Sequence, residues 1–308
     1  MSTRGRGLLF ATATALLWGV LAVVLKYSLR IADVETIVCF RFLLAFVLLG
    51  GLLAARRPDR LRILARPPLL AVAAALLLAV NYRFFFKGIE LRGASNAQVL
   101  IQTAPLMLAL IGVFFFKETL RGLQRAGLVL ALAGFALFLK DQLRLGTWEE
   151  YRWSLLSIGV AAVTWALWAT LSKVLIQRGE RPQALNLFTY GLAGVLFLPF
   201  ADVAPLARAD FGDWCVLVFL GANTLLAYGA LGEALRDAPA NQVSMIITLN
   251  PLITLAVMAV LTSLEVAWIA REPIGALGYG GAALLVGGVL LVVRERPTPP
   301  PPSAAAPR

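Results

Sequence analysis

The stretch "NYRFFFKGIELRGASNAQVLIQTAP" (residues 81–105) decides how this chain folds. It places an amide, a phenol and a guanidinium among neighbouring stretches that are mostly alanine, leucine and valine. A similar stretch, "YGALGEALRDAPANQVSMIITLNP" (228–251), follows later, and each stretch has a tyrosine 23 residues before a proline, Tyr82 in the first and Tyr228 in the second. The recurrence of such a polar segment at a fixed offset predicts an internal repeat.

The composition identifies the environment of these segments. Sixty per cent of the 308 residues are hydrophobic, 15% are charged and the mean hydropathy is +0.81. Soluble domains carry roughly 25% charged residues, so an ordinary water-soluble globule is excluded. Apolar runs of about 20 residues, long enough to cross a bilayer core of roughly 30 Å, predict an all-α polytopic membrane protein. We expect ten transmembrane helices, over residues 8–29, 36–55, 68–88, 95–116, 121–139, 154–175, 184–200, 212–234, 241–264 and 275–293.

The repeat covers the whole apolar region. At an offset of 147 residues, Trp18 corresponds to Trp165 and Lys26 to Lys173. Each copy holds five predicted spans, and because five is odd, the second copy must enter the membrane from the opposite face. Inverted repeats are typical of secondary transporters, whose binding site lies near the midplane between the halves. The predicted organisation is an N-terminal segment (1–7), a first five-helix repeat (8–139), a linker (140–153), a second five-helix repeat (154–293) and a disordered proline-rich tail (294–308).

Basic residues predict the orientation in the membrane. The connectors on the N-terminal side of the bilayer hold 17 lysines and arginines, and those on the other side hold 9. Cytoplasmic loops carry such an excess, so we expect both termini in the cytoplasm and the 140–153 linker outside. These charges lie in short connectors and not along one polar face. The net charge of +11 is therefore interpreted as a consequence of membrane topology, and no nucleic-acid partner is expected.

Several residue types that chemistry would need are missing. The chain has no histidine, and its two cysteines, Cys39 and Cys215, lack metal-ligand or redox spacing. We therefore expect no metal, no other cofactor and no catalytic residue, and an intramembrane enzyme is disfavoured. The absence of Asp or Glu near the middle of any predicted span weighs against an organic-cation/proton antiporter. The expected partners are a small-molecule substrate and the lipid bilayer, with a monomer as one option for the oligomeric state.

Two tryptophans lie deep in the predicted bilayer. At 1.5 Å of rise per residue, Trp18 is roughly 15 Å from one end of its span and Trp165 roughly 17 Å from the opposite end of its own. Tryptophan favours interfaces, so a pair at the midplane predicts either the walls of an internal cavity or packing inside the bundle. Trp168, one turn from Trp165, extends the same wall.

The fourth span of each repeat carries a polar stripe. Gln98, Gln102 and Pro105 lie on one helix face, and their counterparts keep the same spacing. Each proline should leave a carbonyl without its helical partner one turn earlier. The stripe predicts either a cavity lining or hydrogen bonds between helices. The counterparts in the second repeat are Ser244, Thr248 and Pro251, and Asn250 precedes that proline.

Other polar side chains stand closer to the ends of the spans. Arg41 and Arg83 are each about five residues inside a span, which favours anchoring at the headgroups over a positive patch for a carboxylate. Lys26 and Lys173 end their spans at opposite faces, where they either stop the helix or take part in gating. The deeper side chains are better placed to contact an organic substrate, and these are Asn81, Tyr82 and Tyr228.

Three pairs of stretches resemble the EamA-type transporters of the drug/metabolite transporter superfamily. They are the two tryptophan segments, "SNAQVLIQTAPL" with "ANQVSMIITLNPL", and "FKETLRGLQRAG" with "REPIGALGYGG"; in the last pair Glu118, Gly127 and Gly134 correspond to Glu272, Gly281 and Gly288. The resemblance covers nearly all of residues 8–293. It implies a ten-helix carrier in the bacterial inner membrane that exports small metabolites.

Amino acids or related zwitterionic or anionic compounds are the first expectation for the substrate. Aromatic compounds fit the tryptophan and tyrosine walls. The open alternatives are a multidrug, nucleotide or sugar carrier of the same superfamily and a structural membrane protein that transports nothing.

Overall fold

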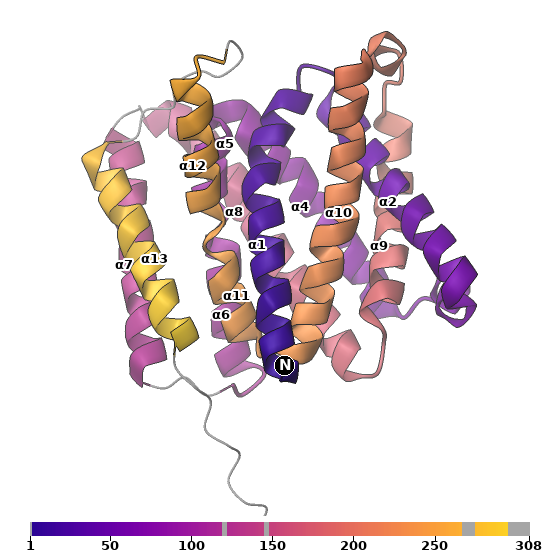
Figure 1. Cartoon of the computed structure of the whole chain (residues 1–308), viewed down its shortest axis with the longest axis horizontal. Coiled ribbons are helices and arrows are strands. Elements are labelled where there is room, and N and C mark those ends of the chain that lie inside the picture. Colours follow the sequence, from indigo (N-terminus) through magenta and orange to yellow (C-terminus); the bar gives the residue numbers. More distant parts are fainter. Residues whose placement is uncertain (1, 119–121, 145–147, 267–274, 295–308) are drawn as a thin grey trace, which may run out of the picture.

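The computed structural model describes residues 2–118, 122–144, 148–266 and 275–294, and within these ranges every regular element is a helix (Figure 1). The predicted all-helical, polytopic fold is confirmed. The first half contains α1 (Thr3–Ser28), α2 (Val34–Arg56), the short α3 (Arg62–Ala65), α4 (Leu69–Arg92), α5 (Ala94–Leu100), α6 (Thr103–Phe114) and α7 (Gly122–Arg144). The second half contains α8 (Trp148–Gln177), α9 (Pro182–Phe197), α10 (Phe211–Asp237), α11 (Ala240–Ile247), α12 (Asn250–Ser263) and α13 (Ala276–Arg294).

The surface of the bundle is apolar. In the described part of the chain nine helical segments are long and apolar enough to cross a membrane, and the apolar stretch Ala276–Leu285 of α13 is a shorter tenth. Large apolar side chains point outward, among them Leu69 (87% exposed), Phe114 (72%) and Val47 (64%). So much exposed apolar surface is unfavourable in water but compatible with contact to the hydrocarbon chains of lipids.

The two halves pack as inverted copies. α1 lies against α10 and α12, and in the equivalent positions α8 lies against α4 and α6. Two further pairs join equivalent helices directly, α2 with α9 at one end of the bundle and α7 with α13 at the other (Figure 1). We call the face where α1 begins and α10 ends the N-terminal face; there Arg6 Nε lies 2.8 Å from Asp237 Oδ2.

The glycines of the repeat bring α7 and α13 into backbone contact. A β-carbon on Gly134 would lie 2.5 Å from the carbonyl oxygen of Gly281, and one on Gly288 would lie 2.4 Å from that of Gly127. Small residues allow this approach in membranes, where packing and not the hydrophobic effect joins helices. The four glycines that match between the repeats therefore form one helix–helix seam.

The spans predicted at 95–116 and 241–264 are each broken in the middle. α5 stops at Leu100 and α6 starts at Thr103, while α11 stops at Ile247 and α12 starts at Asn250. The backbone stays right-handed through both breaks but tightens, so that Gln102 N–H donates to the carbonyl of Val99, three residues back, and not four. Each break precedes a proline, which has no N–H to continue the α-helical ladder.

The breaks divide the bundle into two layers. α6 and α11 lie side by side in the half nearer the N-terminal face, and α5 and α12 lie together in the opposite half (Figure 1). The carbonyl of Ile101, expected to be free, accepts the N–H of Ala104 at 2.9 Å.

Several helices are longer than their apolar runs. α1 begins at Thr3, where Ser2 Oγ accepts the N–H of Gly5 at 3.1 Å, so most of the N-terminal segment expected at 1–7 is helical. α7 and α8 extend into the linker expected at 140–153 and leave only residues 145–147 between them. Polar caps and charged side chains let a helix run past the bilayer core. Residues 295–308 of the expected tail lie outside the described residues.

Candidate functional site

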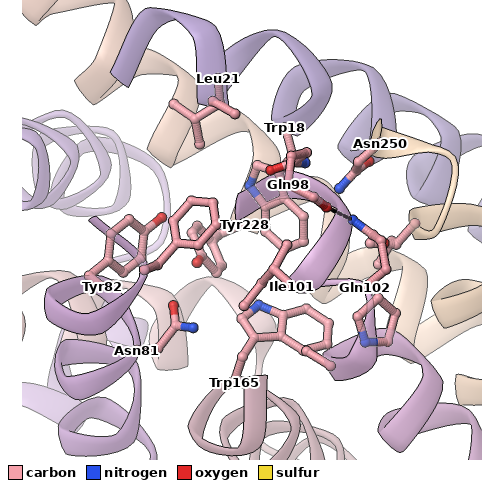
Figure 2. A pocket seen from close by; sticks show the side chains of 15 residues that line it. Trp18, Leu21, Asn81, Tyr82, Gln98, Ile101, Gln102, Trp165, Tyr228 and Asn250 are labelled. Carbon is pink, nitrogen blue, oxygen red and sulfur yellow. Dashed lines mark hydrogen bonds between the residues drawn. The ribbon is translucent and has the colours of Figure 1, made fainter. Parts of the chain in front are cut away.

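A cavity of about 60 Å³ lies where the two breaks meet (Figure 2). It has room for a few water molecules, whereas ligand pockets usually measure roughly 300–1,000 Å³. In this conformation the cavity is therefore too narrow to hold a metabolite. Eleven lining residues come from the first half and four from the second: Trp18, Leu21, Ala22, Asn81, Tyr82, Phe85, Gln98, Ile101, Gln102, Ala104 and Pro105, and then Trp165, Tyr228, Ile247 and Asn250.

The two repeat-equivalent tryptophans meet at this cavity. The ring centroids of Trp18 and Trp165 are 5.8 Å apart, edge to face, although the residues enter from opposite sides of the bundle. Tyr228 lies 5.2 Å from Trp18, 5.1 Å from Trp168 and 6.3 Å from Tyr82. Edge-to-face aromatic pairs are stabilising beyond their buried area, so this cluster forms a rigid wall.

Polar side chains tie this wall to helices of the other half. Asn81 Nδ2 donates to the carbonyl of Ala161 at 2.7 Å, from α4 to α8. At the equivalent contact between α1 and α10, Thr14 Oγ1 donates to the carbonyl of Ala227 at 3.2 Å. Position 227 corresponds to 81 and position 161 to 14, so the two copies keep the hydrogen bond but exchange the residue that donates it.

Gln102 and Gln98 occupy the first break. Gln102 Nε2 donates to the carbonyl of Gln98 at 2.9 Å, which the tightened backbone has left without its usual partner (Figure 2). Its Oε1 is buried and has no hydrogen-bond partner. Because a buried acceptor without a partner is costly, this oxygen is a contact point for a ligand donor or a water molecule.

The second break uses its polar residues to satisfy its own backbone. Thr248 Oγ1 donates to Met245 O at 2.6 Å and Ser244 Oγ to Asn241 O at 3.0 Å, and neither side chain lines the cavity. The Asn250 amide nitrogen, oriented toward its two acceptors, donates to Ala15 O at 2.8 Å and to Ile247 O at 3.0 Å.

Not every expected cavity residue reaches the wall. Trp168 lies behind Tyr228, its indole nitrogen buried without a partner, and Pro251 is buried outside the lining. The expectation also missed apolar lining residues such as Leu21, Phe85 and Ile101. They lie three or four residues from an expected one, so the helical period could have indicated them.

Arg41 is 1% exposed, in contrast to the headgroup anchoring that its position favours. Its Nη2 donates to Thr224 Oγ1 at 2.9 Å and to Tyr82 OH at 3.4 Å, and the guanidinium lies 5.0 Å from the Tyr82 ring centroid. Nη1 has no partner, and no Asp or Glu among the described residues forms an ion pair with this arginine. A net positive charge thus lies directly behind one wall of the cavity.

Arg83 and the two lysines lie away from the cavity. Arg83 Nε forms a 2.8 Å ion pair with Glu35 Oε1, and its side chain is half exposed. Lys26 stands in the last turn of α1. Lys173 is buried and lies 2.6 Å from Glu118 Oε1, so it does more than end its helix. The two arginines do not form one positive patch, because Arg41 is buried beside Tyr82 whereas Arg83 is paired with Glu35.

A family model described as the EamA-like transporter family matches residues 5–140 and again residues 152–294, one match on each half. The chain belongs to the EamA-like transporter family. The resemblance drawn from the sequence is confirmed, and the chain is a multi-pass transporter of the inner membrane.

Curated relatives agree with this assignment. The protein named "Uncharacterized inner membrane transporter YhbE" of Escherichia coli (strain K12) is 35% identical over 284 residues, covering 90% of this chain and 88% of its own. The "Probable amino-acid metabolite efflux pump" of Salmonella typhimurium is 26% identical over 264 residues, covering 82% and 85%. One crystal structure shares the fold, with a TM-score of 0.70 and 21% identity, over 92% of this chain and 95% of that one.

Proposed function

We propose that this EamA-like transporter exports amino acids or related zwitterionic or anionic metabolites by alternating access. The observation that supports the proposal is the narrow cavity between the two repeat halves, where the repeat-equivalent Trp18 and Trp165 lie with ring centroids 5.8 Å apart. Because the cavity is too small for an amino acid, entry and release require the halves to separate first on one side and then on the other.

The lining supports this class of substrate. No charged side chain of the described residues lines the cavity, whose surface is mostly apolar and includes five aromatic rings, with the neutral amides of Asn81, Gln98, Gln102 and Asn250 among its lining residues. Aromatic walls suit an aromatic or aliphatic side chain, and Gln102 Oε1 can accept a hydrogen bond from an ammonium group. Arg41 provides positive potential for a carboxylate. The name of the Salmonella relative also supports an amino-acid metabolite as cargo.

The proposed orientation places both termini in the cytoplasm. The excess of basic residues in the connectors of the N-terminal face supports it. Export then means loading from the N-terminal face and release at the opposite face.

Transport by purified protein tests the proposal. Proteoliposomes loaded with a labelled panel of aromatic, aliphatic and acidic amino acids should release at least one of them faster than protein-free liposomes. Trp18→Ala and Tyr82→Ala should lower this rate more than they lower expression or monodispersity, and Arg83→Ala, outside the cavity, should not. If folded protein moves no amino acid or related metabolite, the substrate class is wrong.

A further inference from the structure

The carboxylate of Glu118 joins three segments at the N-terminal face. Its Oε1 lies 2.6 Å from Lys173 Nζ on α8 and accepts the N–H of Ala240 at 2.9 Å, while its Oε2 accepts the N–H of Asn241 at 3.0 Å. These two N–H groups begin α11 and have no partner within the helix. A carboxylate at a helix N-terminus is also favoured by the helix dipole.

The backbone around Glu118 is shaped to hold this carboxylate. A β-carbon on Gly112 would lie 2.6 Å from Glu118 Oε2, so glycine leaves the room that the carboxylate occupies. Lys117 adopts a left-handed φ of 56°, which turns the chain back under α6, and Glu118 N–H donates to the carbonyl of Gly112 at 3.0 Å. A left-handed conformation is unfavourable for a residue other than glycine, so the contacts around Glu118 must hold this turn in place.

The contact lies between the halves and beside the cavity. Glu118 follows α6 of the first half, and both of its partner segments belong to the second half. α6 and α11 pack together between the cavity and the N-terminal face, and Ile247 at the far end of α11 lines the cavity. From Asn241 to Ile247 is roughly 9 Å along the helix. Breaking all three contacts therefore requires the segment that carries Glu118 to separate from both α8 and α11 on this side.

We propose that Glu118, Lys173 and the first two N–H groups of α11 form a lock that keeps the cavity closed toward the N-terminal face. The proposal rests on alternating access as the proposed function. Lys173 is 5% exposed, with its amine 4.9 Å from the Phe116 ring centroid. A buried charge that loses its partner is strongly unfavourable, so the lock is either formed as a unit or fully open with its charges in water. It thus separates two states of the carrier.

A reporter cysteine in the cavity tests the lock. In a chain with Cys39→Ala and Cys215→Ser, Ala104→Cys is buried in the cavity wall and should react slowly with a membrane-impermeant thiol reagent. Adding Glu118→Gln removes the charge at constant size and should raise the labelling rate tenfold or more, since charge-assisted hydrogen bonds are the stronger ones. The rise should occur only from the face at which Ser2→Cys is labelled.

Two further variants make the result specific. Gly112→Ala keeps every charge but displaces the carboxylate, and it should also raise labelling from the N-terminal face. Lys26→Met, the same kind of change at the repeat-equivalent position on the opposite face, should leave that rate unchanged. If neither Glu118→Gln nor Gly112→Ala raises the rate while both proteins stay monodisperse, or if labelling rises equally from both faces, the lock does not exist.

The readout is independent of any substrate. If labelling changes as expected but no metabolite is transported, the lock stands and the proposed cargo falls. If metabolites are transported and labelling is unaffected, the proposed function stands without this lock.

Discussion

The position of the Arg41 side chain depends on residues of other helices. Counting residues from the end of its span places the guanidinium within reach of headgroups, yet Thr224 and the Tyr82 ring hold it inside the protein. These partners belong to other helices, and no count along one span can predict them. A buried charge without an ion-pair partner lowers stability, so its presence calls for another explanation than folding.

Replacing Arg41 separates stability from transport. Arg41→Met keeps an unbranched side chain and removes the charge, so we expect a melting temperature in detergent equal to or above that of the parent. Transport of a zwitterionic or anionic substrate should fall severalfold, because its carboxylate loses the positive potential behind Tyr82. Thermal unfolding and proteoliposome flux check the two parts.

Arg41→Lys is the matched variant for this test. It keeps the charge but not the planar fork, and it should retain more transport than Arg41→Met. A clear loss of stability in Arg41→Met, with flux reduced only in proportion to folded protein, would assign Arg41 to packing.

Other side chains follow more directly from sequence. The depths of Trp18 and Trp165 predicted that their indoles reach the same level from opposite ends of their spans, and the two ring centroids lie 5.8 Å apart. Thr248 was expected on the polar stripe of the fourth span in the second repeat, as a cavity residue or a link between helices. Its hydroxyl instead donates to the carbonyl of Met245 in its own segment. Depth and helical period predict which residues share a level and a face; they do not predict which acceptor a short polar side chain takes.

At the scale of elements, the sequence predicted where the helices lie but not that two of them are broken. Pro105 and Pro251 each predicted the loss of one helical hydrogen bond. One long kinked helix is as compatible with that loss as two short helices are. The choice depends on side chains: Gln102 caps the carbonyl freed at the first break, and Thr248 does so at the second. These contacts exist only once the backbone has tightened.

The seam between α7 and α13 is an element with a sharp steric requirement. Gly134→Ala would place a β-carbon 2.5 Å from the backbone of α13, so we expect a loss of about 1–3 kcal/mol in stability, seen as a lower melting temperature. Gly287→Ala, whose nearest contact would be an ordinary 3.6 Å, is the control and should melt like the parent. If both variants had the same melting temperature, α7 and α13 could move apart enough to fit the extra β-carbon at little cost in stability.

At the scale of the whole molecule, the repeat predicted most of the fold. Five spans per copy imply opposite directions, and the packing of α1 on α10 and of α8 on α4 reproduces that relation. The length of the linker between the copies was predicted less well, because α7 and α8 continue through charged and polar residues beyond the apolar runs.

Thiol labelling tests the orientation of the halves. In a chain without its native cysteines, Ser2→Cys and Trp148→Cys lie at exposed positions at the starts of α1 and α8. An impermeant maleimide applied to intact cells should label Trp148→Cys and not Ser2→Cys, and permeabilisation should make both react. Labelling of both in intact cells would place the two helix starts in one compartment and rule out the inverted arrangement.

The unequal wall of the cavity has a consequence for how such carriers diverge. Eleven of its fifteen lining residues precede the linker, so in the proposed carrier the amino-terminal repeat would provide most of the surface that recognises the substrate. A chimera that joins residues 2–144 of this chain to the second repeat of a relative should inherit the cargo preference of this chain. New selectivity would then arise fastest through changes in one copy of the ancient duplication.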